Sequence, residues 1–244
     1  MKQTIKKYTP DLILDFIKIK KRYRQQKKQS AKDIFTTYKE TKFWKSTESL
    51  SGDGSELAVT LELRKGLDAL IKSFSITSIL DIPCGDFNWM KEVDLQHVNY
   101  IGGDIVASLV VSNTEQYASK HIAFKELDII TNSLPKVDLI ICRDCLVHLS
   151  YKDIYKALQN IKKSESDYLL LTSFVNSETN KDILTGEWRK LNFKKYPFNF
   201  GKPQLIIDEK YTEKDLKYVD KSMCLWRVED IKLPLKLKIY SWFF

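Results

Sequence analysis

The chain has 244 residues and carries 40 Lys and Arg against 32 Asp and Glu, a formal net charge of +8. This length suffices for one domain with a substantial core, and no apolar run is long enough to span a membrane. The four cysteines lack the dense spacing of a disulfide framework, and residues 1–10 lack the apolar core of a signal peptide. These features argue against membrane-spanning and disulfide-stabilised secreted proteins, and they predict a cytoplasmic location.

Two of the cysteines, Cys142 and Cys145, form a CxxC pair. A zinc site of this type needs a second pair or a cluster of histidines, and the sequence contains neither. We therefore expect both cysteines to pack in the interior, and we expect no metal.

Most of the positive charge lies in residues 1–45, which hold fourteen Lys and Arg against four Asp and Glu. Over residues 11–28, apolar residues recur at helical spacing and basic residues occupy the other side, which predicts a basic amphipathic helix. Three roles remain open for this extension: a solvated face, a peripheral contact with an anionic membrane surface at the inner face, or a contact with nucleic acid.

Residues 46–55 form a loop rich in glycine and serine. A loop of this composition either folds over a ligand as a lid or serves as an ordinary linker. Ser55 is placed to cap a helix predicted over residues 57–73, where apolar residues recur at helical spacing. Trp44 and Ser55, at the two ends of the loop, are candidate substrate-binding residues.

Two segments follow in which an apolar run ends in an acidic residue. They are ITSILDIPCGDFNWM at residues 76–90, where the run ends at Asp81, and YIGGDIV at residues 100–106, where it ends at Asp104. Each predicts a buried parallel strand whose carboxyl end opens onto a ligand crevice. Gly85 permits a tight turn and a close approach of backbone N–H groups to a ligand. Asp104 ends the second strand, where a carboxylate can accept hydrogen bonds from both hydroxyls of a ribose. These features predict a nucleoside-containing cofactor, and the charge of Asp86 disfavours a pyrophosphate.

Helices and strands alternate beyond this point, as in an α/β domain with a parallel sheet. We predict helices over residues 107–119 and 151–161, and strands over residues 121–127, 137–142, 168–172, 202–208 and 223–228. The predicted fold is a Rossmann-like α/β domain over residues 56–231, with a seven-stranded, mostly parallel sheet and a C-terminal antiparallel hairpin. A helical N-terminal extension precedes this domain, and residues 232–244 form an apolar tail.

The segment ICRDCLVHLS, residues 141–150, lies at the predicted end of the fourth strand. His148 has an unperturbed pKa that suits a general base, and Asp144, about one helical turn earlier, could orient its ring. The alternative role for His148 is to cap the following helix or pack beneath it. Arg143 could pair with an anionic substrate group or with carboxylates of the domain itself.

Aromatic and polar side chains cluster at and after the fifth predicted strand. Rings combined with amide and guanidinium groups suit a sugar or another polar ring, and a packed loop would use the same residue types. The candidate substrate-binding residues in this region are Phe174, Trp188, Arg189 and Asn192.

The string LDIPCGDFNWM, residues 80–90, resembles motif I of the Rossmann-like methyltransferases that use S-adenosylmethionine (SAM), which usually reads LDxxCGxG. Phe87 stands where that motif commonly has its second glycine. Together with SGDGS, CRDCLVHLS and the segments at residues 185–209 and 220–231, the chain resembles a group of bacterial SAM-dependent methyltransferases associated with surface-glycan and polysaccharide genes. The resemblance covers about residues 43–231.

This resemblance implies that SAM lies across the strand tips, with Asp81 and Gly85 near its methionine moiety, Asp104 at its ribose and Asp128 near its adenine. The residues predicted to bind SAM are Asp81, Pro83, Cys84, Gly85, Asp86, Asn88, Trp89, Asp104, Ile105, Asp128, Ile129 and Arg143.

The tip of the fourth strand lacks the N/D-P-P-Y/F tetrad of adenine and many amide methyltransferases, which favours an oxygen acceptor. The predicted function is methyl transfer from SAM to an oxygen of a polar small-molecule or glycan acceptor, with His148, Asp144 and Arg143 as catalytic residues. Two alternatives remain: an RNA or other nucleic-acid methyltransferase that uses the basic extension, and a non-catalytic SAM-binding partner protein.

Overall fold

The computed structural model describes residues 29–211, 218–234 and 237–238. The amphipathic helix predicted at residues 11–28 lies outside these ranges, as does most of the tail predicted at residues 232–244. No helix within the described ranges is long and apolar enough to cross a membrane.

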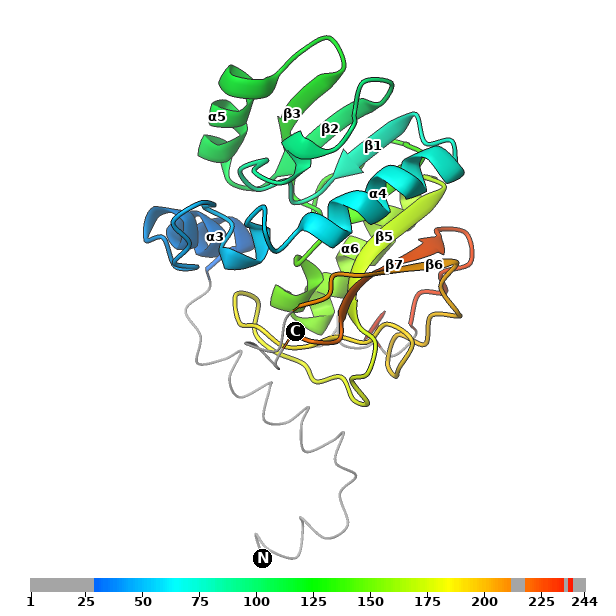
Figure 1. The fold of residues 1–244 in the computed structure, drawn as a ribbon. Helices are drawn as coiled ribbons and strands as arrows, with labels where there is room; N and C mark the ends of the chain where they lie inside the picture. Colours follow the sequence, from blue (N-terminus) through cyan, green and yellow to red (C-terminus); the bar gives the residue numbers. More distant parts are fainter. Residues whose placement is uncertain (1–28, 212–217, 235–236, 239–244) are drawn as a thin grey trace, which may run out of the picture.

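The predicted seven-stranded sheet is present, with the strand order β3-β2-β1-β4-β5-β7-β6. Its strands are β1 (Ser78–Asp81), β2 (Asn99–Asp104), β3 (Ile122–Glu126), β4 (Leu139–Cys142), β5 (Tyr168–Phe174), β6 (Leu205–Asp208) and β7 (Lys221–Arg227). The first five strands pair in parallel, and β7 runs antiparallel to both β5 and β6. The mostly parallel sheet with a C-terminal antiparallel hairpin is therefore confirmed (Figure 1).

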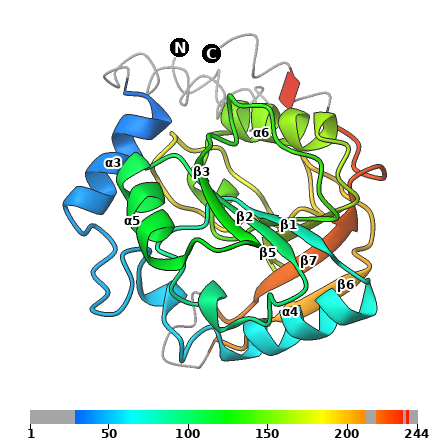
Figure 2. The ribbon, with the colours of Figure 1, turned by 90° about the horizontal axis from the view of Figure 1, so that it is seen from above.

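Helices flank both faces of this sheet. The α-helices of the described residues are α3 (Ala31–Glu40), α4 (Leu61–Ser73), α5 (Ala107–Tyr117) and α6 (Tyr151–Lys163). Seen from above, α4 covers one face of the sheet and α6 covers the other (Figure 2).

Helix α4 begins at Leu61, four residues later than the sequence predicts. Its N-cap is Thr60, so the prediction that Ser55 caps this helix is wrong. The Leu57 N–H donates to Glu48 Oε1 (2.7 Å) and the Ser55 carbonyl accepts from the Asn88 side chain (3.1 Å). These bonds hold residues 55–57 against Glu48 and Asn88, ahead of the helix.

Alternate residues of the central strands face opposite sides of the sheet, which separates two hydrophobic clusters. In β4, Leu139 and Ile141 belong to the cluster under α4, whereas Ile140 and Cys142 belong to the cluster under α6. A strand covered on both faces needs a continuous apolar run, and β4 has one. Burial of each such side chain contributes about 1.5–3 kcal/mol to stability.

Asp138 joins the amino ends of β1 and β4. Its Oδ2 atom accepts hydrogen bonds from the Thr77 N–H (2.7 Å), the Thr77 hydroxyl (2.7 Å) and the Ser78 N–H (2.9 Å). Burial alone would raise the pKa of Asp138, but these hydrogen bonds outweigh it and hold the pKa below its usual value.

Replacement of Asp138 with Ala should lower the free energy of unfolding at neutral pH by about 1–3 kcal/mol, because three donors lose a charged acceptor. A depressed folded-state pKa gives stability that is present above the unfolded-state pKa and is lost as the pH falls through the folded-state value. The difference from the wild type should therefore narrow in acid, which urea titrations at neutral and acidic pH would measure. Asp230→Ala is the control, since Asp230 is exposed; equal losses in both variants would contradict this account.

Candidate functional site

A large pocket lies at the carboxyl ends of β1, β2 and β4. Its walls come from the turn after β1, the tip of β2, the loop after β3, the segment after β4, and α3 with the loop that follows it. Figure 1 shows α3 and this loop beside the sheet, at the side where the turn after β1 lies. The pocket therefore occupies the crevice that the sequence predicts for a ligand.

The turn after β1 is held against Asp104. Gly85 has φ of +56°, in the left-handed region that favours glycine. Its N–H donates to Asp104 Oδ2 (3.0 Å), and the Val106 N–H donates to Asp104 Oδ1 (2.9 Å). From α5, the Asn113 side chain donates to the Gly85 carbonyl (2.8 Å). The glycine and the acid that the sequence assigns to one ligand are thus neighbours on the pocket wall.

Two buried carboxylates lie at this end of the pocket. Asp104 lines the pocket, and Asp81 lies beneath the turn, outside the lining. The Tyr100 hydroxyl donates to Asp81 Oδ2 (2.8 Å), while Asp81 Oδ1 is buried without a hydrogen-bond partner among the described residues. Burial is the main cause that raises the pKa of Asp81 to about 7 and the pKa of Asp104 to about 6. Nearby positive charge would stabilise both ionised forms.

Residues 46–57, which we call the cover segment, fold against the turn after β1. The Asp86 carboxylate accepts hydrogen bonds from the Leu50 N–H (2.6 Å) and the Ser51 hydroxyl (3.3 Å). A Cβ atom on Gly85 would lie 2.2 Å from Ser51 Oγ, so a side chain at this position would displace the Ser51 hydroxyl. Asp86 lines the pocket, but its carboxylate holds a segment of the chain itself.

A second attachment of the cover segment uses Asn88, which lies outside the pocket lining. Its Nδ2 atom donates to Glu48 Oε1 (2.6 Å) and to the Ser55 carbonyl (3.1 Å). The sequence predicts that Asn88 binds the cofactor. In the structure its side chain instead bonds the cover segment. In this structure the cover segment forms a wall of the pocket, and its opening as a lid stays a prediction.

Four charged side chains form a cluster beside the cover segment, and we call it the ion cluster: Arg143, Asp144, Glu209 and Lys221. Arg143 Nη2 donates to Glu209 Oε2 (2.6 Å) and to the Gly54 carbonyl (2.7 Å). Lys221 Nζ pairs with Asp144 and lies 3.4 Å from Glu209 Oε2. Burial opposes ionisation of Asp144, but Lys221 and Arg143 keep its pKa below the usual value. The two positive and two negative charges of the cluster balance. Of the two roles predicted for Arg143, the structure shows the pairing with carboxylates of the domain itself.

His148 lines the pocket from a short 3-10 turn, Leu146–His148, after β4. Its Nδ1 atom lies 3.0 Å from the Glu187 carbonyl oxygen. Because a carbonyl only accepts, Nδ1 carries the hydrogen and Nε2 is left as the proton acceptor of the neutral ring. Burial lowers the pKa of His148 to about 4, so the ring is neutral at neutral pH.

The prediction that Asp144 orients the ring of His148 is wrong, because the Glu187 carbonyl bonds the ring instead. The sequence predicts one helical turn between Asp144 and His148. In the structure Asp144 has φ of +50° and therefore does not belong to a helical turn. Its N–H donates to Thr172 Oγ1 (2.8 Å), and its carboxylate pairs with Lys221.

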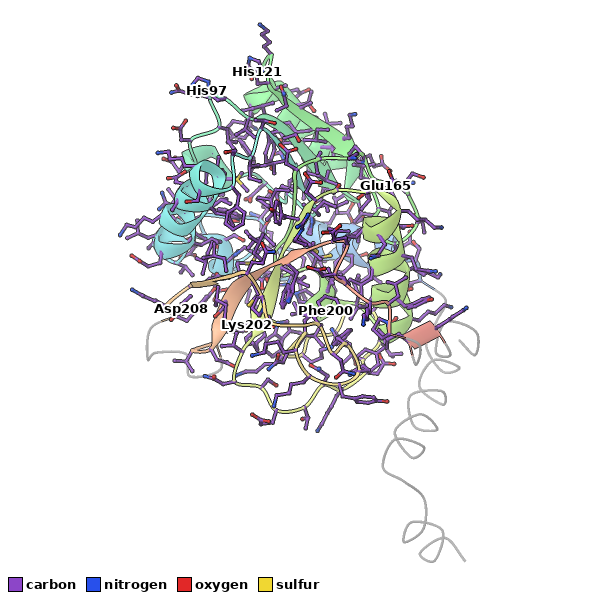
Figure 3. All side chains as sticks on the ribbon, turned by 90° about the vertical axis from the view of Figure 1, so that its right-hand side faces the viewer. His97, His121, Glu165, Phe200, Lys202 and Asp208 are labelled. Carbon is purple, nitrogen blue, oxygen red and sulfur yellow. The ribbon has the colours of Figure 1, made fainter. Side chains whose placement is uncertain are left out.

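The other two histidines lie elsewhere. His97 and His121 are exposed and precede β2 and β3, so they lie at the amino ends of the strands, opposite the pocket. Figure 3 shows both at one end of the molecule. Within the described ranges no group of His, Cys, Asp and Glu could hold a metal ion.

The predicted site residues divide into two groups. Those that line the pocket are Trp44, Ser55, Pro83, Cys84, Gly85, Asp86, Trp89, Asp104, Ile105, Asp128, Ile129, Arg143, Asp144, His148 and Trp188. Outside the lining, besides Asp81 and Asn88, are Phe174, Arg189 and Asn192.

Buried polar side chains outside the pocket bond the backbone. Arg189 donates to the carbonyls of Leu146 (2.8 Å) and Leu149 (2.6 Å). The Asn192 side chain donates to two further carbonyls of the loop after β5. Phe174 is 1% exposed and supports Trp188 edge-on, at 5.8 Å between ring centroids. These residues shape the loop that carries Trp188, and the structure does not bring them to the pocket.

Sequence reasoning missed several residues of the lining: Phe35, Lys39, Tyr211, Tyr218 and Lys221. Two of them belong to α3, whose start is marked by a capping box at Ser30 and Asp33. This local signal predicts a helix but not its position. That position depends on distant contacts such as the hydrogen bond from the Tyr38 hydroxyl to the Gly186 carbonyl (2.9 Å).

No family model matches the sequence, and no curated protein matches it. Solved structures match its fold at low sequence identity. Magnesium protoporphyrin IX methyltransferase from Synechocystis PCC 6803 with bound SAM is 12% identical, with a TM-score of 0.50 over 82% of this chain and 97% of that chain. The same enzyme with bound SAH matches over 49% of this chain and 58% of its own length.

A second similar structure is the N-methyltransferase NodS from Bradyrhizobium japonicum WM9. It is 15% identical, with a TM-score of 0.50 over 70% of this chain and 96% of that chain. At these identities the similarity concerns the fold alone. The chain has a Rossmann-like fold of the kind found in these methyltransferases.

Proposed function

We propose that this protein binds SAM and transfers its methyl group to an oxygen of a polar acceptor. The observation that carries the proposal is that one pocket is lined both by the Gly85–Asp104 turn and by His148. The fold shared with two methyltransferases supports it by analogy.

The residues around Gly85 fit SAM. Both oxygens of Asp104 accept hydrogen bonds from backbone N–H groups, and the carboxylate has capacity left for a ribose hydroxyl. The buried carboxylates of Asp81 and Asp104 suit a ligand that carries positive charge, as the sulfonium and ammonium groups of SAM do. Bound SAM would supply an electrophilic methyl group.

An acceptor hydroxyl loses its proton as its oxygen takes the methyl group, and in this proposal His148 Nε2 receives the proton. The Glu187 carbonyl holds the tautomer that this role requires. The low pKa keeps the ring neutral before the reaction. Positive charge then forms on the ring, and the nearby Asp144 carboxylate favours it.

A sugar or glycan acceptor is our preferred class. Trp44 and Trp188 line the pocket and offer faces on which a sugar ring can stack. Incubation of the protein with labelled SAM and either cell-envelope extracts or RNA separates the acceptor classes. If RNA gains the labelled methyl group, and the amount transferred falls steeply as the salt concentration rises, the nucleic-acid alternative is favoured instead.

SAM binding should depend on Asp104. Calorimetry should detect binding of SAM but not of NAD, because Asp86 and the single glycine of this turn do not suit a pyrophosphate. Asp104→Ala should weaken SAM binding by about 1.5–3 kcal/mol, the range for hydrogen bonds to a charged group. Asp230→Ala, with its exposed carboxylate, is the matched control. Binding of NAD without binding of SAM would overturn the cofactor assignment.

The affinity for SAM should rise with pH. In the free protein the pKa of Asp104 is about 6 and that of Asp81 about 7, and a positively charged ligand favours the ionised forms. Binding should therefore release protons, and the affinity should increase through this range and level off above it. Calorimetry in two buffers of different ionisation enthalpy measures the protons released, and Asp104→Asn should reduce their number. An affinity that falls with pH over the same range would contradict the assigned role of these carboxylates.

Replacement of His148 with Ala should lower kcat about 10²–10⁴-fold, the usual contribution of a positioned general base. The affinity for SAM should change little, since the ring acts on the acceptor. Methyl transfer to the acceptor fraction identified with labelled SAM provides the measurement, and His121→Ala, at an exposed histidine, is the control. Full activity in His148→Ala would show that His148 has only a structural role.

A further inference from the structure

We propose that the acceptor carries a negatively charged group, a carboxylate or a phosphate, and that Lys39 of α3 binds this group. The inference rests on the proposed methyl transfer and adds the chemical class of the acceptor. It begins from the position of α3 and from the balance of charges around the pocket.

Helix α3 presents one face to the pocket. Phe35 and Lys39 are four residues apart in this helix, so they lie on the same face, and both line the pocket. The rings of Phe35 and Trp44 lie 6.4 Å and 6.0 Å from the imidazole of His148, measured between centroids. Lys39 therefore lies one helical turn beyond an aromatic ring that contacts the proposed base.

The docking of α3 is fixed by the loop that also orients the base. The Tyr38 hydroxyl donates to the Gly186 carbonyl (2.9 Å), and the next residue, Glu187, accepts from His148. Gly186 has φ of +101°, and a Cβ atom there would lie 2.8 Å from Ile34 Cγ2. Since one loop holds both the helix and the imidazole, the distance between Lys39 and His148 is constrained by packing.

Lys39 differs from the other cations of the pocket. Arg143 and Lys221 are neutralised within the ion cluster by Glu209 and Asp144. Among the described residues, the Lys39 ammonium group forms no hydrogen bond or ion pair. It is therefore available to a ligand in a way that the cluster cations are not.

The carboxylates of the pocket already accept hydrogen bonds from the chain. Asp53 accepts from the Gly54 N–H (2.8 Å), Asp86 accepts from the cover segment, and Asp128 accepts from the Ile130 N–H (2.8 Å). Asp104 is bound by backbone N–H groups at the cofactor end. None of these carboxylates pairs with the Lys39 ammonium group. A negatively charged group of the acceptor can therefore be its partner.

These positions define an acceptor with three parts. A hydroxyl lies at His148, a ring packs against Phe35 and Trp44, and an anionic group reaches Lys39. The hydroxyl and the anionic group should therefore lie on different parts of one acceptor molecule.

The test uses the full chain saturated with SAH and pairs of probes that differ in charge. The first set is D-glucose, D-glucuronate and D-glucose 6-phosphate, and the second is 4-hydroxybenzyl alcohol and 4-hydroxybenzoate. In at least one set, calorimetry should show an anionic probe bound about tenfold more tightly than the neutral one. A comparison of D-glucuronate with D-glucose 6-phosphate then decides whether Lys39 prefers a carboxylate or a phosphate.

Lys39→Gln should abolish this preference and leave the affinity for the neutral probe unchanged. Lys72→Gln is the matched control, because Lys72 lies in the last turn of α4 as Lys39 lies in the last turn of α3. Lys72→Gln should keep the preference.

A preference that survives Lys39→Gln, or the absence of any preference for the anionic probes, overturns the proposal. Failure of the wild type to bind SAH would instead overturn the proposed function, so the two failures are distinguishable. Lys39→Gln should bind SAH as the wild type does, which shows that its effect is confined to the acceptor.

Discussion

Three parts of the chain meet at the guanidinium of Arg143: the parallel sheet, the C-terminal hairpin and the cover segment. Arg143 follows β4, Glu209 follows β6, and Gly54 belongs to the cover segment. The side chains of Arg143 and Glu209 are 4% and 0% exposed, so neither charge is solvated. Removal of one partner of such a pair leaves an uncompensated buried charge, at a cost of about 3–5 kcal/mol. This requirement for a partner holds the three parts in one arrangement, and the pocket lies between them.

Two parts of the pocket differ in charge. At the β1–β2 end, the carboxylates of Asp81 and Asp104 are buried and have raised pKa values, which favours a positively charged ligand. At the α3 end, Lys39 supplies positive charge next to an aromatic wall. The ion cluster, with two positive and two negative side chains, is neutral. Under the proposed function, this distribution of charge directs the cofactor and the acceptor to different parts of the pocket, with His148 acting on the acceptor.

The fold could be predicted because its signals are local. A strand covered on both faces, such as β4, needs a continuous apolar run, and an acid-tipped run followed by glycine marks the crevice end of β1. The start of α4 was misplaced because the bonds of Leu57 to Glu48 and of Ser55 to Asn88 hold the chain ahead of the helix, and the apolar pattern of residues 57–73 does not report them. The geometry of Asp144 was misjudged for a related reason, since helical spacing does not apply to a residue with φ of +50°.

The sequence by itself determined the order of the strands along the chain, the crevice at their carboxyl ends, and the proximity of Gly85 and Asp104. Tertiary structure alone decided how the site around His148 is assembled. The bond from Tyr38 to Gly186 spans 148 residues, the pair of Arg143 with Glu209 spans 66, and the contact of His148 with Glu187 spans 39. Periodicity and turn chemistry describe neighbours within a few residues of one another. Contacts over these separations form only when the packed sheet and helices bring the loops together, so no local pattern reports them.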